Sequence, residues 1–377
     1  MHPMLKPALR RAWRDRQTVQ FGITPTQAVV VSPVDPATGH FLELLDGTQG
    51  LPILYERARA LDLSPARVDE LLARLTAAGV VDDPTAGGAA AEALRSRSDA
   101  LERLRPDLVS LSLLHPQPGD AARRLAARRA IRVQVRGAGR VGAAIAAVLS
   151  GSGVGRVDVL DGGVAQPGDV APGGLTGQAV GERRATAAGR LVRAAAPGGP
   201  PRQGRDGEQP GLSMIVVAPR EALDVHAPNA LDAEDWVRAG IPHLYAGVVE
   251  TTGVVGPLVL PGGTGCAGCL SLTRTERDPG WPRLLAQWRS GRQRTSVPAC
   301  DLALASAVAG LAAAHALAFL DGDLPSSTGS RWEASLPGLD WRSAPVEPHR
   351  DCFCGADGNI QGERASGAAG PHDTMAQ

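Results

Sequence analysis

The sequence predicts an α/β protein in which a Rossmann-like domain stands between a small N-terminal module and a cysteine-bearing tail. Three observations predict this. A β-branched strand runs directly into a glycine turn and an alanine-rich helix, an acid ends the next strand, and two cysteine pairs lie far apart. The 377 residues are enough for two or three domains.

The composition restricts the partners of the chain as a whole. Its formal net charge is +0 and no basic block stands out, so nothing favours nucleic acid, an anionic membrane or an acidic partner. Small molecules, peptides and proteins remain. Lys6 is the only lysine, so a step that usually needs a lysine beside a phosphate must here use an arginine.

No segment is predicted to export the chain or to cross a membrane. The start, MHPMLKPALRRAW, has basic residues but no apolar run behind them, so it does not resemble a secretory signal. The stretch from Leu302 to Leu320 is about as long as a membrane span, but it is dominated by alanine and carries Ser306 and His315. We therefore expect a buried core helix and a cytoplasmic protein.

The first unit is predicted to be a winged-helix-like α+β module. Phe41 to Leu45 and Gly50 to Leu61 indicate short helices, and Ser64 caps an amphipathic helix that Gly79 ends before a strand. Such modules bind DNA or peptide, or only pack, and no basic recognition helix argues for DNA. The stretch from Asp83 to Ala91 is predicted to be a linker because it is rich in proline, glycine and threonine.

A glycine turn is the most informative feature of the chain. Ile131 to Arg136 is a β-branched strand, followed at once by Gly137, Gly139 and Gly142 and by a helix to Leu149. Glycine at these three places gives a tight turn, lets the backbone approach a phosphate and allows close packing of the helix. This context predicts a nucleotide site, against the alternative of a turn that serves packing alone.

Further strands extend the predicted sheet. Val157 to Leu160 is a strand that ends at Asp161, an acid at the spacing expected for a ribose ligand. Ser213 to Ala218 is a buried strand. His243 to Glu250 and Gly253 to Leu260 form a tight hairpin that leads to the first cysteine pair.

Four of the five cysteines form two close pairs. Cys266 and Cys269 make a CxxC knuckle, and Cys352 and Cys354 stand near the C-terminus, preceded by His349. A knuckle and a distant second pair supply four thiolates to one tetrahedral ion, which predicts a structural zinc. The alternatives are a disulfide in each pair, or the histidine in place of one of the last two thiolates.

These features together resemble the ThiF/MoeB family of activating enzymes, over about residues 130–320 plus the cysteine tail. The resemblance implies that ATP, with Mg, binds at the glycine turn and that the C-terminal carboxylate of a carrier protein or peptide is adenylated, as for ubiquitin-like modifiers. It implies Gly137, Gly139 and Gly142 as the phosphate loop, Asp161 as the ribose ligand, and the cysteine pairs as the zinc set.

The resemblance also gives the domain bounds. They are a winged-helix-like module at 1–84, a linker with connecting helices at 85–128, a ThiF-type Rossmann domain at 129–325, and a tail at 326–377 that closes the zinc site. The last residues of this tail are expected to be disordered.

Two catalytic positions follow from the same resemblance. Arg184 replaces the family's lysine after a glycine, and Cys300 stands where the family carries its reactive cysteine. The next helix, together with Arg292 and Arg294, is expected to favour a thiolate there. The alternative is that Cys300 is an inert, buried residue.

The chain departs from the family pattern around the phosphates. Gly162 and Gly163 stand where a second acid is expected, and the loop 168–174 lacks the family's Asn and Arg. Pro219 and Arg220 replace an acid that binds magnesium. Phosphoryl chemistry depends on such positioned charge, so these departures weigh against catalysis.

Three functions are therefore considered. The first is an adenylyltransferase, with a sulfur-transfer partner and a homodimer both compatible with it. The second rests on the N-terminal module: a winged-helix unit before a ThiF-like domain resembles the leader-binding proteins of thiazole/oxazole-modified peptide biosynthesis. Such a protein presents a precursor peptide to a separate cyclodehydratase. The third, a nicotinamide-dependent dehydrogenase, leaves the cysteine pairs unexplained.

Overall fold

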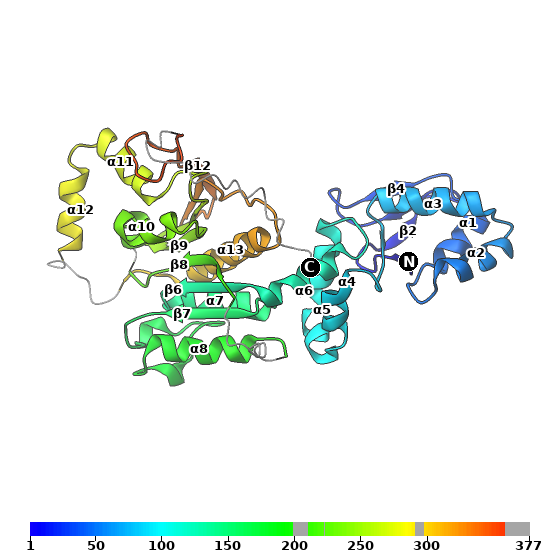
Figure 1. Ribbon diagram of the computed structural model, residues 1–377, viewed down its shortest axis with the longest axis horizontal. Helices are drawn as coiled ribbons and strands as arrows, with labels where there is room; N and C mark the ends of the chain where they lie inside the picture. The colour runs from blue at the N-terminus through cyan, green and yellow to red at the C-terminus, as the bar shows by residue number, and fades with distance from the viewer. Residues whose placement is uncertain (199–209, 222, 291–297, 359–377) are drawn as a thin grey trace.

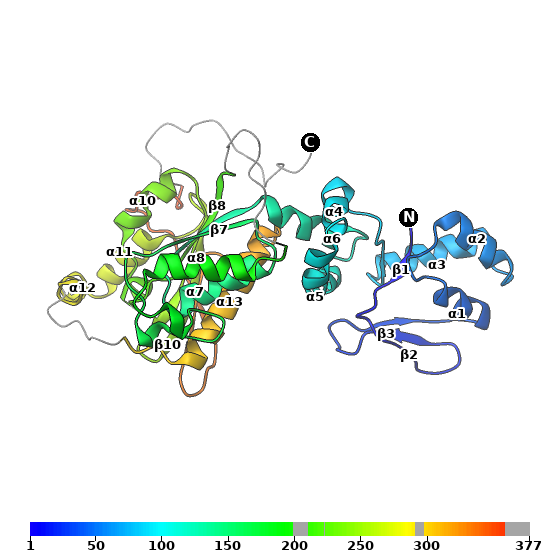
Figure 2. The ribbon, with the colours of Figure 1, turned by 90° about the horizontal axis from the view of Figure 1, so that it is seen from below.

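The computed structural model describes residues 1–198, 210–221, 223–290 and 298–358. The N-terminal module lies at one end of an elongated molecule, the large sheet domain lies at the other, and three connecting helices lie between them (Figure 1). Figure 2 shows the same three parts from below. Arg292, Arg294 and the end of the tail that is expected to be disordered, from residue 359 onward, lie outside the described residues.

The N-terminal module combines short strands with three helices. Its elements are β1 (Met4–Leu5), β2 (Arg11–Trp13), β3 (Val19–Phe21), β4 (Val29–Val31), α1 (Pro36–Glu43), α2 (Leu51–Arg59), α3 (Pro65–Ala77) and β5 (Val81–Asp82). Strands β2, β3 and β4 form an antiparallel sheet, and β1 pairs with β5. One apolar core joins the sheet to the helices.

Helices lie at the three predicted places of this module, although α1 begins at Pro36, before the predicted start at Phe41. The Ser64 hydroxyl accepts a hydrogen bond from the Arg67 amide at 3.4 Å, which caps α3. Leu72 and Leu75 are buried on the apolar stripe of α3. Gly79 has a φ of 70°, a left-handed turn that ends the helix before β5.

Two features of this region differ from the prediction. The sheet β2–β4 was missed because three-residue strands are too short to give a clear alternation. Helix α4 (Gly88–Arg95) begins inside the predicted linker, so the linker prediction is wrong from Gly88 onward. Alanine is the best helix former, and an alanine run follows the two glycines, so the helix continues once it has started.

The connecting helices are α4, α5 (Ser98–Leu114) and α6 (Asp120–Ala127), and they have a small core of their own. The buried Lys6 ammonium donates to the carbonyl of Ser112 and so fastens the N-terminal module to α5. On the other side, Arg128 pairs with Asp321 through two hydrogen bonds of 2.6 and 2.8 Å. Both side chains of this pair are buried, so losing either partner leaves an unpaired buried charge.

The large domain is built on one seven-stranded sheet. Its elements are β6 (Arg132–Arg136), α7 (Arg140–Gly151), β7 (Arg156–Leu160), α8 (Arg184–Ala195), β8 (Leu212–Val217), α9 (Leu223–His226), α10 (Ala230–Arg238), β9 (His243–Val249), β10 (Thr252–Val259), α11 (Ala267–Arg277), α12 (Trp281–Arg289), α13 (Leu302–Leu320), β11 (Ser330–Ser335) and β12 (Arg342–Pro345). The strand order is β12-β11-β10-β9-β8-β6-β7. Strands β7, β6, β8 and β9 are parallel, and β9 to β12 are antiparallel.

The register of the parallel strands brings the predicted site together. Arg136 at the end of β6 is level with Leu160 of β7 and with Val217 of β8. The next residue of each strand, Gly137 and Asp161 among them, therefore lies at one edge of the sheet. Ligands of open parallel sheets bind at this carboxyl edge.

Helices cover both faces of the sheet. Helices α7 and α13 pack on one face, and α10 and α11 lie on the other (Figure 1). Among the described residues, only α13 is long and apolar enough to cross a membrane by length and composition. Its Leu304, Val308 and Ala312 side chains are buried in the main core, as predicted for a core helix.

Candidate functional site

The glycine turn is packed as closely as predicted. Gly137 has a φ of 110°, and a Cβ there would lie 2.0 Å from the carbonyl oxygen of Ala218. A Cβ at Gly142 would lie 2.1 Å from the carbonyl oxygen of Gly137. Neither position accepts a side chain, because each neighbour is backbone that cannot move aside.

The third glycine leaves room at the start of α7. Gly139 is the N-cap and provides no side-chain acceptor for the amides of the first helical turn. A Cβ built on Gly139 would have as its nearest neighbour the Arg220 side chain, at 3.2 Å. Free amides and the helix dipole make this end of α7 suitable for an anion.

Asp161 lies at the end of β7, and its carboxylate is already occupied. It accepts hydrogen bonds from the Ala138 amide at 2.9 Å, the Gly163 amide at 2.7 Å and Arg184 Nε at 3.0 Å. Burial alone would raise the pKa of Asp161, but these hydrogen bonds outweigh it and lower the pKa. The carboxylate is therefore ionised and paired, and its role as ribose ligand stays a prediction.

A second buried carboxylate, Asp169, extends this pair into a network. Arg220 Nε lies 2.6 Å from Asp169 Oδ1, and Arg184 Nη1 lies 3.5 Å from Asp169 Oδ2. Arg220 also donates to Gln166 Oε1 at 2.6 Å. We call Asp161, Arg184, Asp169 and Arg220 the charge network.

Sequence reasoning placed Arg184 and Arg220 at altered family positions, but it missed Asp169. The sequence offered two signals for this pair, Arg220 in place of an acid after β8 and Asp169 in the loop after β7. Their pairing could not be predicted, because only the fold brings these two loops together at the edge of the sheet.

A cavity of about 710 Å³ opens beside the charge network at the carboxyl ends of β6, β7 and β8. Arg136, Arg184 and Arg220 line it, and the Arg136 guanidinium stacks 4.4 Å from the Trp236 ring. Tyr245 completes the wall on the β9 side. The volume is in the usual range for a nucleotide-sized ligand.

The two cysteine pairs come together as predicted. Sγ of Cys266 lies 3.9 Å from that of Cys269 and 3.5 Å from that of Cys352, and Cys269 lies 3.4 Å from Cys354. Zinc–sulfur bonds of about 2.3 Å in a tetrahedron put sulfurs about 3.8 Å apart, so these thiols fit one zinc ion. All four are buried and free, which removes the disulfide alternative.

His349 is not part of this cysteine cluster. Its Nε2 lies 3.0 Å from Glu276, and its Nδ1 accepts a hydrogen bond from the Asp351 amide. Cys266, Cys269, Cys352 and Cys354 form one set that could hold a metal, and His349 belongs to a second set, with Glu276 and Asp351. The histidine therefore does not replace a thiolate in the cysteine set of this structure.

Cys300 lies beside the glycine turn, although 160 residues separate it from Arg140. Arg140 Nη1 donates to the Cys300 carbonyl at 2.7 Å. The Asp301 carboxylate caps α13 by accepting from the Leu304 amide at 3.0 Å, so an acid already takes the favourable helix end. Burial, with Asp301 and Asp169, raises the pKa of the Cys300 thiol. The described surroundings of Cys300 do not favour a thiolate, but Arg292 and Arg294 lie outside the described residues, so the thiolate and its reactivity stay predictions.

Fold and site together define a Rossmann-type α/β protein with a glycine turn at the carboxyl edge of its sheet and a cluster of four cysteine thiols. The ThiF family model matches residues 111–356, and the chain belongs to the ThiF family. No protein with a curated description matches it by sequence. Family membership leaves the dehydrogenase alternative without support.

Solved structures share the fold of nearly the whole chain. MccB from E. coli, in a structure with AMPCPP and MccA, has 16% identity and a TM-score of 0.67, covering 94% of this chain and 100% of that chain. MccB with succinimide has 17% identity and a TM-score of 0.66, with 95% and 100% covered. The heterocyclase TruD has 15% identity and a TM-score of 0.60, but this chain covers only 43% of it.

Replacing Cys269 with serine should unfold the distal part of the large domain more easily. One ligand is lost from a cluster that joins α11 to the tail, so the free energy of unfolding should fall by roughly 3 kcal/mol or more. Thermal denaturation with metal analysis measures this. The Cys300→Ser variant is the matched control and should keep the wild-type metal content. Equal metal content and stability in both variants would contradict a metal role.

Alkylation by iodoacetamide tests Cys300. If the thiol takes part in chemistry, it should react first in the native protein, while the four clustered thiols react only after chelation. Peptide mapping by mass spectrometry gives the order, with Cys300→Ser identifying the peptide. A Cys300 that stays unlabelled until denaturation would exclude acyl or sulfur transfer through it.

Proposed function

We propose that this protein is an ATP-dependent adenylyltransferase that activates the C-terminal carboxylate of a peptide or small carrier protein. The observation that carries the proposal is the nucleotide-sized cavity at the Gly137 turn, in a chain of the ThiF family. One solved structure of MccB contains AMPCPP and MccA, and we propose the corresponding ligand classes, a nucleotide and a peptide, for this chain. Coverage of nearly the whole chain includes the N-terminal module, for which we propose a peptide-binding role.

In this reaction a carboxylate oxygen attacks the α-phosphorus of ATP. A bond forms between them, the bond to the bridging oxygen breaks, and pyrophosphate leaves with the electron pair. The products are a mixed anhydride of peptide and AMP, and pyrophosphate. The first-turn amides of α7 would hold phosphate oxygens, and Arg184 and Arg220 would offset their charge.

The position of the family's magnesium-binding acid does not fit a metal ion here, although four exposed acids, Glu221, Asp224, Asp232 and Asp235, also line the cavity. Arg220 stands at the position of the metal-binding acid, and the nearby buried carboxylates Asp161 and Asp169 are both paired with arginines. We therefore assign the phosphate charge to the arginines and no step to magnesium. The cysteine cluster fits zinc, which would stabilise the domain without taking part in the reaction.

A second candidate is a partner protein that binds a precursor peptide and has lost catalysis. The charge network favours it, because both arginines that would meet the phosphates are already held by carboxylates. Recruiting Arg220 to ATP would cost its hydrogen bond to Asp169. If the protein is a peptide-binding partner, we expect it to act with a cyclodehydratase. If it is an adenylyltransferase, a sulfur-transfer partner is expected instead. A homodimer and a cytoplasmic location stay predictions for both candidates.

Gly139→Val tests nucleotide binding at the turn. The valine side chain would fill the space in front of the α7 amides and press on Arg220, so ATP affinity should fall at least about tenfold. Calorimetric titration with AMPCPP measures the affinity, and thermal denaturation checks the fold. Gly177→Ala is the matched control, because a Cβ there meets nothing within 4 Å. Equal affinity in wild type and Gly139→Val would place the nucleotide elsewhere.

Exchange of labelled pyrophosphate into ATP separates the two candidates. We expect exchange with a pool of random peptides that end in a free carboxylate, and none with the same pool amidated. The free carboxylate is the nucleophile, so amidation removes the reaction and leaves the remaining peptide contacts. ATP binding without exchange in either pool would favour the peptide-binding partner.

A further inference from the structure

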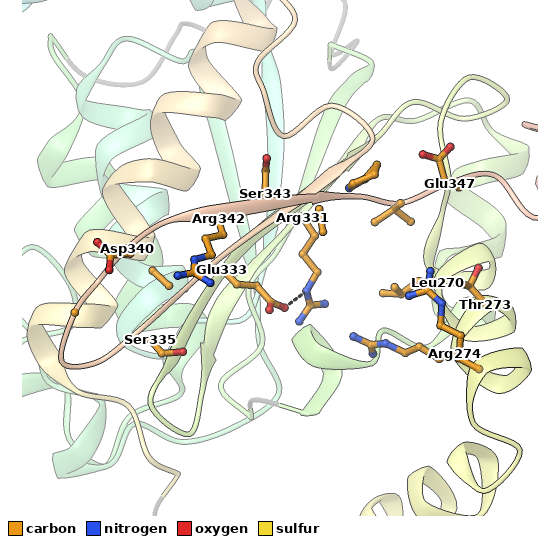
Figure 3. Close-up of a pocket in the computed structure, with 16 residues that line it drawn as sticks. Leu270, Thr273, Arg274, Arg331, Glu333, Ser335, Asp340, Arg342, Ser343 and Glu347 are labelled. Carbon is orange, nitrogen blue, oxygen red and sulfur yellow. Dashed lines mark hydrogen bonds and ion pairs between the residues drawn. The ribbon is translucent and has the colours of Figure 1, made fainter.

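A second cavity lies on the large domain, between α11 and the hairpin β11–β12 (Figure 3). Its volume is about 620 Å³. Four arginines line it, and they come from the helix and from both strands: Arg274, Arg277, Arg331 and Arg342. We call it the arginine cavity.

Two of these guanidinium groups converge on one carbonyl. Arg331 donates to the His226 carbonyl oxygen at 3.0 Å, and Arg274 donates to the same oxygen at 2.6 Å. Arg331 is only 5% exposed, so its charge is held in place by the fold. Two like charges beside each other in a half-buried site repel, and a bound anion would relieve that repulsion.

The acidic residues of the cavity offset this charge only in part, because three acids, Glu333, Asp340 and Glu347, face four arginines. Glu333 pairs with Arg331 at 2.5 Å and also attracts Arg274. Within the described residues, Arg274 has no carboxylate partner; it stacks 5.0 Å from the Trp281 ring instead. Burial and the neighbouring Arg331 lower its pKa to about 10, and it stays charged at neutral pH. In Figure 3 Asp340 and Glu347 lie toward opposite ends of the lining, with Arg331 and Arg342 between them.

The arginine cavity adjoins the nucleotide cavity. A small hollow shares Leu270 and Arg274 with the arginine cavity and Pro228 with the nucleotide cavity. The segment 226–229 therefore separates two sites on the same part of the domain.

The lining suits an extended peptide better than a ligand with a ring system. It contains no aromatic side chain, and one wall is the exposed chain of β12, from Arg342 to Pro345. Guanidinium groups form paired hydrogen bonds with carboxylates. We propose that the arginine cavity binds an acidic segment of the peptide substrate, upstream of the carboxylate that is activated. The position of the acidic segment before the activated carboxylate rests on the proposed function.

Fluorescence polarisation of a labelled oligoglutamate peptide, without ATP, tests this binding on the full-length protein. An oligoglutamine peptide of equal length is the neutral control. We expect the glutamate peptide to bind more tightly, and added salt to weaken it. Arg277→Gln and Arg342→Gln, both at exposed positions, should each weaken it about fivefold.

Two control variants and a competition experiment with inorganic phosphate make the result specific. Arg193→Gln removes an exposed arginine of α8 outside the cavity and should change nothing. Gly139→Val should keep the peptide affinity even where ATP binding is lost, so failure of the proposed function and failure of this inference are distinguishable. Equal affinity for the two peptides, equal loss in Arg193→Gln, or complete competition by inorganic phosphate would overturn the inference.

Discussion

Two buried carboxylates at the edge of a parallel sheet constrain the whole candidate site. Burying the carboxylates of Asp161 and Asp169 costs free energy unless they have partners, and Arg184 and Arg220 provide them. The same pairs fix the loops after β7 and β8 relative to the glycine turn. The cavity thus has a defined shape before any ligand enters, but its cations are already shared with the protein's own acids.

The rest of the large domain holds that edge in place. The turn is fixed by backbone contact between Gly137 and Ala218, and α13 packs on one face of the sheet. The cysteine cluster joins α11 to the tail, and other residues of α11, among them Arg274 and Arg277, line the arginine cavity. Stability and ligand binding are therefore linked through α11, whose N-terminus carries two thiols and whose last turns carry Arg274 and Arg277.

Much of this could be predicted, because the informative signals are local. The strand, turn and helix around Gly137 and the two cysteine pairs depend on spacing within a few residues. The features that were not predicted are contacts between residues far apart in the sequence: β1 pairs with β5, Asp169 with Arg220, and Arg140 with the Cys300 carbonyl. The neutral total charge likewise concealed a cavity in which four arginines gather, since composition does not say which charges become neighbours.

The most direct test of this account is a structure determined with bound AMPCPP. We expect the phosphates at the first-turn amides of α7, with Arg220 turned from Asp169 toward them and Arg184 still paired with Asp161. An unchanged charge network at saturating nucleotide, with no density at the Gly137 turn, would contradict the account.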